Sequence, residues 1–229
     1  MHDIQNKILK ILLLNEKSKF TELNVDNIGN DHFTFHIKKL CELKFVLKDK
    51  QGFYHLTDEG KEYANRLDID GGKIEVERQA KTGVLLVCTK IEDGVKKYLI
   101  QKRLKHPFYG YHGFVGGKIK WGESIFDAAK RELKEETGIE GSLRLAGVEH
   151  KIDFDKKDKL LEDKFFYVFE ITDINGELLK EFDAGENFWA TECGINDLSE
   201  LFDDVLSILR IVKEEEFNFS EKKYIVKRY

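Results

Sequence analysis

The amino-acid sequence predicts an α+β protein built from two domains. Residues 3–67 combine helical apolar periodicity with one hairpin pattern, whereas the rest of the chain has longer strand-like runs around a carboxylate-rich helix. A short acidic connector with two glycines, residues 68–72, separates the two patterns. A chain of 229 residues is long enough for two modest domains. We therefore expect domains at residues 1–70 and 71–229.

The first domain begins with helical segments. Apolar residues at helical spacing indicate a first helix, residues 20–23 indicate a short second one, and a third follows Asn30 and Asp31. The apolar stripes are Ile4, Ile8, Ile11 and Leu12 in the first helix, and Phe33, Ile37, Leu40 and Leu43 in the third. These two helices therefore each have an apolar face for a shared core.

A β-hairpin and a last helix complete this domain. Residues 45–48 and 53–56 have the composition of strands, and residues 50–52 form the turn between them. Thr57 is placed to cap a helix whose first turn contains Asp58 and Glu59, which favour a helix N-terminus.

This order of helices, hairpin and closing helix resembles the winged helix-turn-helix regulators of bacteria and archaea. The resemblance implies that the third helix enters the major groove of DNA and that the hairpin touches the backbone or minor groove. The positions that would face DNA are His32, Thr34, Phe35, His36, Lys38 and Lys39. Residues 1–67 hold 11 basic and 10 acidic side chains, a weak basic footprint. A module for dimerisation or for docking on the second domain is therefore an equal alternative.

The second domain contains one long motif, from Gly117 to Ile139. It consists of Gly117, Glu123 and the run RELKEETGI, which starts at Arg131. Ser124 and Asp127 form a capping-box pattern, and Gly138 suits the left-handed end of a helix. We therefore expect a helix over residues 125–137.

The carboxylates of this helix predict a metal site. Glu132, Glu135 and Glu136 are spaced i, i+3 and i+4, so they share one helix face. Without a counter-charge they would raise each other's pKa, whereas a hard divalent cation, Mg²⁺ or Mn²⁺, removes this repulsion. Arg131 can pair with Glu135 one turn later. A solvated acidic face is the alternative, which the neighbouring glycine loop and Glu123 disfavour.

The glycines before the helix suit the approach of a ligand. Gly116 and Gly117 allow the backbone to come close to a bound group, and their carbonyls can complete a metal shell. Lys118 can meet a phosphate or hold Glu123.

The motif matches the signature of the Nudix hydrolases, and the chain resembles that family over residues 83–212. The resemblance implies an α/β/α sandwich with a mixed β-sheet, and Mg²⁺-assisted hydrolysis of a nucleoside diphosphate linked to another group. It assigns metal binding to Glu132, Glu135, Glu136 and the Gly116 carbonyl, and orienting roles to Glu123 and Arg131. The catalytic set is then Glu135, Glu132, Arg131 and Glu123.

The resemblance also suggests substrate contacts and an alternative base. Arg103 resembles a phosphate-contacting arginine, although a surface arginine is as good an interpretation. Phe114 stacks on a base or, as we favour, belongs to the core. Gly117 and Lys118 complete the expected substrate contacts. Asp183 and Glu186 resemble an acidic loop that supplies a general base in some relatives, but an ordinary surface turn explains them equally well.

The remaining features concern the substrate class, the C-terminal elements and the cellular location. The proline typical of ADP-ribose pyrophosphatases, about fifteen residues past the motif, is missing, and residues 154–157 read FDKK. Residues 198–212 indicate a final helix, and residues 224–229 a terminal strand or tail. Scattered cysteines give neither a disulfide framework nor a zinc site. No membrane segment or signal peptide is apparent, so a cytoplasmic location is expected, and family members are often homodimers.

Two functions from different classes remain. The first is a nucleotide pyrophosphohydrolase with an accessory winged helix, and the second is a transcriptional regulator that senses a nucleotide through the Nudix domain. We favour hydrolysis, because every carboxylate of the motif is present. Hydrolysis at RNA 5′ ends is a third and weaker hypothesis.

Overall fold

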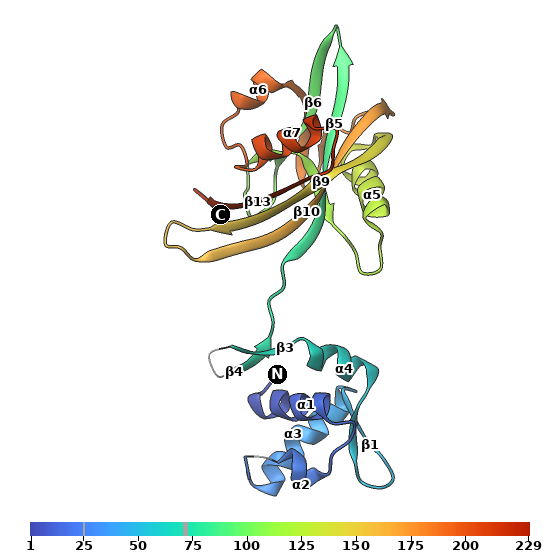
Figure 1. Cartoon of the computed structure of the whole chain (residues 1–229), viewed down its shortest axis with the longest axis vertical. Helices are drawn as coiled ribbons and strands as arrows, with labels where there is room; N and C mark the ends of the chain where they lie inside the picture. The colour runs from blue at the N-terminus through green and yellow to red at the C-terminus, as the bar shows by residue number, and fades with distance from the viewer. Residues whose placement is uncertain (25, 71–72) are drawn as a thin grey trace. The chain divides into compact units, whose positions relative to one another are not determined.

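The computed structural model describes residues 1–24, 26–70 and 73–229, and it divides the chain into two units, Met1–Arg78 and Gln79–Tyr229 (Figure 1). The division comes after residue 78 and not after residue 70, because strand β3 (Leu67–Asp70) pairs with strand β4 (Lys73–Val76) inside the first unit. Gly71 and Gly72 of the expected connector lie outside the described residues.

The first unit has the predicted order of elements. Helices α1 (Asp3–Leu14), α2 (Phe20–Leu23) and α3 (Asn30–Glu42) precede the antiparallel strands β1 (Val46–Lys48) and β2 (Tyr54–Leu56), and α4 (Asp58–Asn65) follows. Thr57 caps α4, because its side chain accepts a hydrogen bond from the Gly60 amide. The β3–β4 pair was not predicted from the sequence.

A single apolar core holds the first unit together. It contains the predicted stripes of α1 and α3, with Ile8, Leu12, Phe33 and Leu40 almost fully buried. Leu43 departs from the prediction, since it is the C-cap of α3 and is exposed.

The second unit is built on one mixed β-sheet. Its strand order is β11-β12-β6-β5-β10-β9-β13, with β7 on β6 and β8 on β5. β10 runs parallel to β5 and β13 runs parallel to β9, while the other pairs are antiparallel. The strands are β5 (Lys81–Glu92), β6 (Val95–Arg103), β7 (His112–Gly113), β8 (Val115–Lys118), β9 (Glu140–Phe154), β10 (Leu160–Asn175), β11 (Glu181–Phe182), β12 (Gly185–Thr191) and β13 (Asn218–Ile225).

Helices cover the two faces of this sheet, as Figure 1 shows. Helix α5 (Ile125–Thr137) packs Ala128 and Leu133 against Leu86 and Phe169 on one face. Helices α6 (Glu192–Asn196) and α7 (Val205–Lys213) pack on the other, where Ile208 lies in a second core. The predicted mixed sheet between helices is therefore confirmed.

The motif helix begins and ends at the predicted residues, whereas the C-terminal elements differ from those predicted. The Ser124 side chain accepts from the Asp127 amide, and Gly138 ends α5 with φ 75°. The expected final helix at 198–212 starts only at Val205, because residues 198–204 pass over the sheet as turns and a bridge. Strand β13 begins at Asn218 and thus ahead of the terminal strand or tail expected at residues 224–229. None of the helices in the described residues is long and apolar enough to cross a membrane.

Candidate active site

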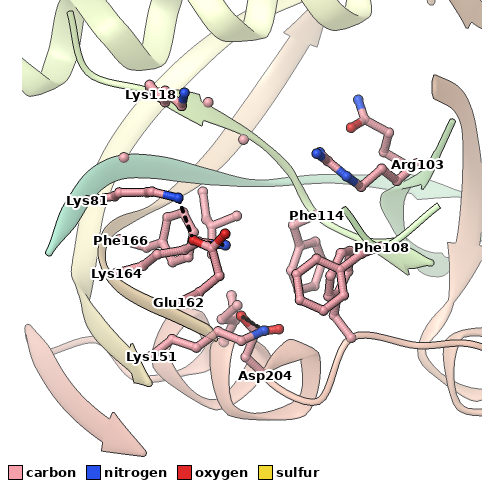
Figure 2. A pocket seen from close by; sticks show the side chains of 18 of the residues that line it. Lys81, Arg103, Phe108, Phe114, Lys118, Lys151, Glu162, Lys164, Phe166 and Asp204 are labelled. Carbon is pink, nitrogen blue, oxygen red and sulfur yellow. Dashed lines mark hydrogen bonds and ion pairs between the residues drawn. The ribbon is translucent and has the colours of Figure 1, made fainter. Parts of the chain in front are cut away.

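A cavity of about 590 Å³ opens in the second unit beside the motif (Figure 2). Strands β5, β6, β8 and β10, helix α5, helix α7 and the loop of residues 104–111 contribute to its wall. Of the predicted site residues, those that line it are Arg103, Phe114, Gly116, Gly117, Lys118, Glu132 and Glu136. The sheet thus brings together at one cavity the glycine strand, which is β8 with Gly116 and Gly117, two carboxylates of the motif, and Arg103.

Arg131 connects the motif carboxylates to one another. Its Nε and Nη2 donate to the two oxygens of Glu123 at 2.7 and 2.9 Å, and its Nη1 donates to Glu132 at 2.7 Å and to Glu135 at 3.2 Å. Nη2 also donates to the Lys118 carbonyl at 3.0 Å. The predicted pairing with Glu135 is present, but the bidentate partner is Glu123.

Glu123 is held in its charged form. The Arg131 hydrogen bonds, and then the bond from the Lys120 amide, lower the pKa of Glu123 to about 2. The guanidinium is in turn stabilised as a cation, since its partners raise the pKa of Arg131. This anchor fixes the loop after β8 against the first turns of α5.

Glu132 lies directly over the glycine strand. A Cβ atom at position 117 would stand 1.9 Å from Cδ of Glu132, so only glycine leaves room for this carboxylate. Glu132 is buried, at 8% exposure, and one of its oxygens accepts from Arg131. The side chain of Glu135, by contrast, is 57% exposed.

Glu136 is partly buried at the cavity, and its pKa is raised. Burial is the main cause and the charge of Glu132 adds to it, while a hydrogen bond from Gln101 Nε2 at 3.0 Å works in the opposite direction. Asn187 Nδ2 donates to the Glu136 carbonyl at 2.7 Å. Glu132 and Glu136, one helical turn apart, are therefore two acidic side chains that both lose contact with water at the cavity.

The donor chemistry of this place fits a hard cation. Glu132, Glu136 and the carbonyls of Gly116 and Gly117 are oxygen donors, and a cation would offset both the burial and the charge of Glu132 that raise the Glu136 pKa. Among the described residues, however, no group of three or more Asp, Glu, His or Cys side chains is close enough together to hold a metal ion. Glu135, expected as the third carboxylate, is turned towards Arg131.

Arg103 reaches the cavity from the end of β6. Its Nε donates to the Pro107 carbonyl at 2.6 Å and its Nη2 to the His106 carbonyl at 3.3 Å, so the loop at 104–111 sets its direction. Burial lowers its pKa. Phe114 is both core and wall, since it belongs to the α7-side core and lines the cavity.

The alternative bases are not brought to this place. Neither Asp183 nor Glu186 is among the described residues that line the cavity. Glu186 pairs in register with Lys102 and its carboxylate lies 3.4 Å from the Lys102 ammonium. Successive side chains of a strand point to opposite faces, so Gln101 and Arg103 reach the cavity and Lys102 does not.

In the first unit the structure corrects one expected DNA contact. His36 is 4% exposed, because it shares the core face of α3 with Phe33 and Leu40 and packs against His2 with ring centroids 4.4 Å apart. His36 therefore cannot face DNA. His32, Phe35, Lys38 and Lys39 are exposed, and Thr34 is partly so.

Several cavity residues were not predicted from the sequence. They are Lys81, Gln101, Lys151, Glu162, Lys164 and Asp204. Gln101 could have been found, since it lies two residues before Arg103 and hence on the same strand face. The others come from strands and a loop whose pairing no local pattern specifies.

Comparison with known proteins adds a family and a fold. The model of the family described as NUDIX domain matches residues 80–211. An ADP-ribose pyrophosphatase of Methanocaldococcus jannaschii is 34% identical over 115 residues, which cover 50% of this chain and 64% of that protein. The chain thus spans less than two thirds of that relative's length. The mMutator MutT protein from Bacillus halodurans superposes with a TM-score of 0.54 at 23% identity, over 65% of this chain and 93% of that one, which shows a shared fold.

Proposed function

Because this chain belongs to the NUDIX family, we propose that it hydrolyses the pyrophosphate linkage of a nucleoside diphosphate derivative, assisted by Mg²⁺ or Mn²⁺. One observation carries the proposal: Glu132 and Glu136 stand beside a glycine strand in a cavity with a cationic wall. The cationic residues of that wall are Lys81, Arg103, Lys105, Lys118, Lys151 and Lys164. An anionic substrate and a cation between two carboxylates would balance this arrangement.

Glu132, Glu136 and the Gly116 carbonyl would hold the metal ion, with Glu135 as a further carboxylate of the same helix. When bound, the ion would polarise the phosphate oxygens and lower the pKa of a water molecule. Arg131 orients Glu132 and ties it to Glu123, and Gln101 fixes Glu136. Arg103, aimed by two carbonyls, would contact a phosphate.

Removal of a proton from the attacking water is assigned to a carboxylate of α5. Asp183 and Glu186 are not among the described cavity residues, whereas Glu132 and Glu136 are. Such a base typically increases the reaction rate about 10²–10⁴-fold.

ADP-ribose is the first substrate to test. The relative from Methanocaldococcus jannaschii is named an ADP-ribose pyrophosphatase, and it matches half of this chain. The proline expected of such enzymes past the motif is absent here, where the sequence reads FDKK. We therefore propose a nucleoside diphosphate linked to a sugar or a similar group as the substrate class.

The test is a nucleotide panel that includes ADP-ribose, with Mg²⁺, Mn²⁺ or EDTA. Glu136→Gln should lower kcat by about 100-fold or more, because it removes a charge at the proposed metal without changing the shape of the side chain. Glu140→Gln is the matched control, since Glu140 is an exposed partner of Lys134 that follows the same helix. Equal rates for wild type and Glu136→Gln, or turnover that persists in EDTA, would contradict the proposal.

A second function, binding of DNA by the first unit, is favoured by one surface. Helix α3 exposes Phe35, at 63%, together with Lys38 and Lys39, and the β1–β2 hairpin exposes Lys48 and Lys50. We propose that this unit is a winged helix that binds the DNA backbone with these lysines.

Lys38→Ala/Lys39→Ala should weaken binding and reduce the slope of log K against log salt by about 0.9 for each lost phosphate contact. An unchanged slope would exclude both lysines. Nucleotide binding without turnover, together with DNA retention, would indicate a regulator.

A further inference from the structure

Two lysines stand side by side in the cavity wall. Lys81 on β5 and Lys164 on β10 are direct partners in a parallel strand pair, so their side chains leave the same face of the sheet. Both line the cavity (Figure 2). Like charges at directly paired positions destabilise a sheet, so this placement needs a compensating anion.

Glu162 supplies part of that compensation. It lies two residues before Lys164 on the same strand face, and one of its oxygens is 2.8 Å from the Lys81 ammonium and 3.4 Å from that of Lys164. Its other oxygen accepts from the Tyr229 hydroxyl at 2.6 Å. Burial opposes the charge of Glu162, but these partners together lower its pKa. One carboxylate is thus fixed between two ammonium groups.

Lys81, Lys164 and Glu162 together leave one positive charge, whereas Lys151 with Asp204 and Asp153 leaves one negative charge beside them. The next lysine along the wall, Lys151, is 5% exposed and matched by Asp204 at 3.2 Å and Asp153 at 3.8 Å, so it takes no counter-charge from Glu162. Burial is the main cause that lowers the pKa of Lys164 and Lys151 adds to it, while the charges of Glu162 and Asp153 act in the opposite direction. An ammonium has three N–H groups, so a bond to Glu162 leaves donors on Lys81 and Lys164 for a ligand.

We propose that Lys81 and Lys164, held by Glu162, bind a phosphate group that the substrate carries in addition to its pyrophosphate linkage. Gly116, whose carbonyl is proposed to hold the metal, pairs with Leu85, and Lys81 precedes Leu85 by four residues. The lysine pair is therefore about 13 Å along β5 from that carbonyl. That offset suits a separate substituent and not the linkage itself. The assignment to the substrate rests on the proposed function, whereas the binding site does not.

The site is tested directly by calorimetric titration of the full chain with inorganic phosphate in EDTA, where binding through a metal is excluded. Wild type should show saturable binding. Lys81→Gln and Lys164→Gln should each weaken it about tenfold, as expected for the loss of one charge-assisted hydrogen bond. The double variant should bind no phosphate, and Lys164→Arg should retain binding because it keeps the charge.

Lys213→Gln is the matched control, since it removes an exposed lysine that pairs with Glu192 outside the cavity. Melting curves confirm that each variant is folded, and the removal of a like charge from the pair should not destabilise the sheet. Absence of saturable binding by wild type, or binding by the double variant equal to that of wild type, would overturn the site.

Kinetic measurements distinguish a phosphate group carried by the substrate from free inorganic phosphate as the ligand of the lysine pair. In a comparison of ADP-ribose with ADP-ribose 2′-phosphate, Lys164→Gln should lower kcat/KM about tenfold more for the compound with the further phosphate than for ADP-ribose. Equal losses for both compounds would refute the assignment to substrate and leave free inorganic phosphate as the ligand. If no nucleotide is hydrolysed, the proposed function fails, yet the titration in EDTA still decides whether the lysine pair binds phosphate.

Discussion

Arg131 and Gly117 set the position of Glu132 from two sides. Arg131 donates to Glu132 while being fixed by both oxygens of Glu123, and Gly117 leaves the volume that the carboxyl group fills. Neither residue needs to touch a substrate to matter. At the residue scale, the geometry of the acidic site therefore depends on the shape of a planar guanidinium and on a missing methyl group.

Arg131→Lys should impair the site although the charge is kept. A lysine cannot donate to both oxygens of Glu123 and also to Glu132, because its ammonium is a single point on a flexible stem. Metal affinity or activity is expected to fall about 10- to 100-fold, as is usual for residues that orient metal ligands. Isothermal titration with Mn²⁺ and steady-state kinetics measure the two effects. Unchanged affinity and rate would show that Glu132 is positioned without Arg131.

Gly117→Ala should displace Glu132 and abolish most of the activity. The added Cβ would meet the carboxyl carbon of Glu132 at 1.9 Å, so this side chain must leave its place. We expect a loss of about 100-fold in kcat/KM. Gly194→Ala is the control, because its new Cβ would find Thr191 Oγ1 at 3.4 Å, an ordinary contact. Comparable activity of the two variants would show that Glu132 can move without consequence.

At the element scale, pairing between strands distant in sequence assembles the cavity. β5 joins β10 in parallel, which places Lys81 and Lys164 together, while β6 joins β12, which places Gln101 beside Asn187 next to Glu136. The edge strand β13 is connected to β9 through His150, whose ring nitrogens contact Glu221 at 2.6 Å and Asp163 at 2.9 Å.

The His150 contacts predict a pH-dependent contribution to stability. Burial disfavours the charged ring, but the bonds to Glu221 and Asp163 outweigh it and raise the pKa of His150. A raised histidine pKa stabilises the fold fully below the unfolded value of about 6.5 and loses this effect as pH rises through the folded value. The contribution should be about 1 kcal/mol or less, because Glu221 is exposed.

Thermal melts from pH 5.5 to 8.5 test this expectation. The stability of wild type relative to His150→Gln should be greatest at the acidic end and should decline above pH 6.5. Parallel pH curves for the two proteins would mean that the contacts of His150 do not depend on its charge.

At the scale of the whole molecule, the cavity belongs to one of the two units. The described residues that line it all lie between Lys81 and Ile208, and the chain divides between Arg78 and Gln79. Each unit has its own apolar core, one around Phe33 and the other on the two faces of the mixed sheet. The residues proposed for catalysis therefore all belong to the second unit.

Removal of residues 1–78 should leave hydrolysis intact. A unit with its own core can fold alone, so kcat/KM on any substrate of the full chain should stay within about twofold. The measurement is steady-state kinetics of residues 79–229 beside the full chain, with circular dichroism to confirm folding. A folded but inactive fragment would show that the first unit takes part in catalysis.

Local patterns of the sequence predicted much of this outcome. The ends of α5 followed from Ser124 and Gly138, and the order of helices and hairpin in the first unit followed from apolar spacing. The placement of His36 on a DNA-facing surface was wrong, although its spacing from Phe33 and Leu40 already indicated the core face. The β3–β4 pair and the late start of α7 were missed, since short strands and turns depend on their neighbours.

By itself the sequence determined the motif helix, its carboxylates and the glycine strand, because capping, helical spacing and steric freedom are properties of residues close together in the chain. Only the tertiary structure decided that Glu123 is the main partner of Arg131, that Asp183 and Glu186 are not among the described residues that line the cavity, and that Lys81 is paired with Lys164. These outcomes depend on the register and order of strands that are far apart in the sequence, such as β5 and β10, which are fixed when the sheet forms as a whole and which no local pattern encodes.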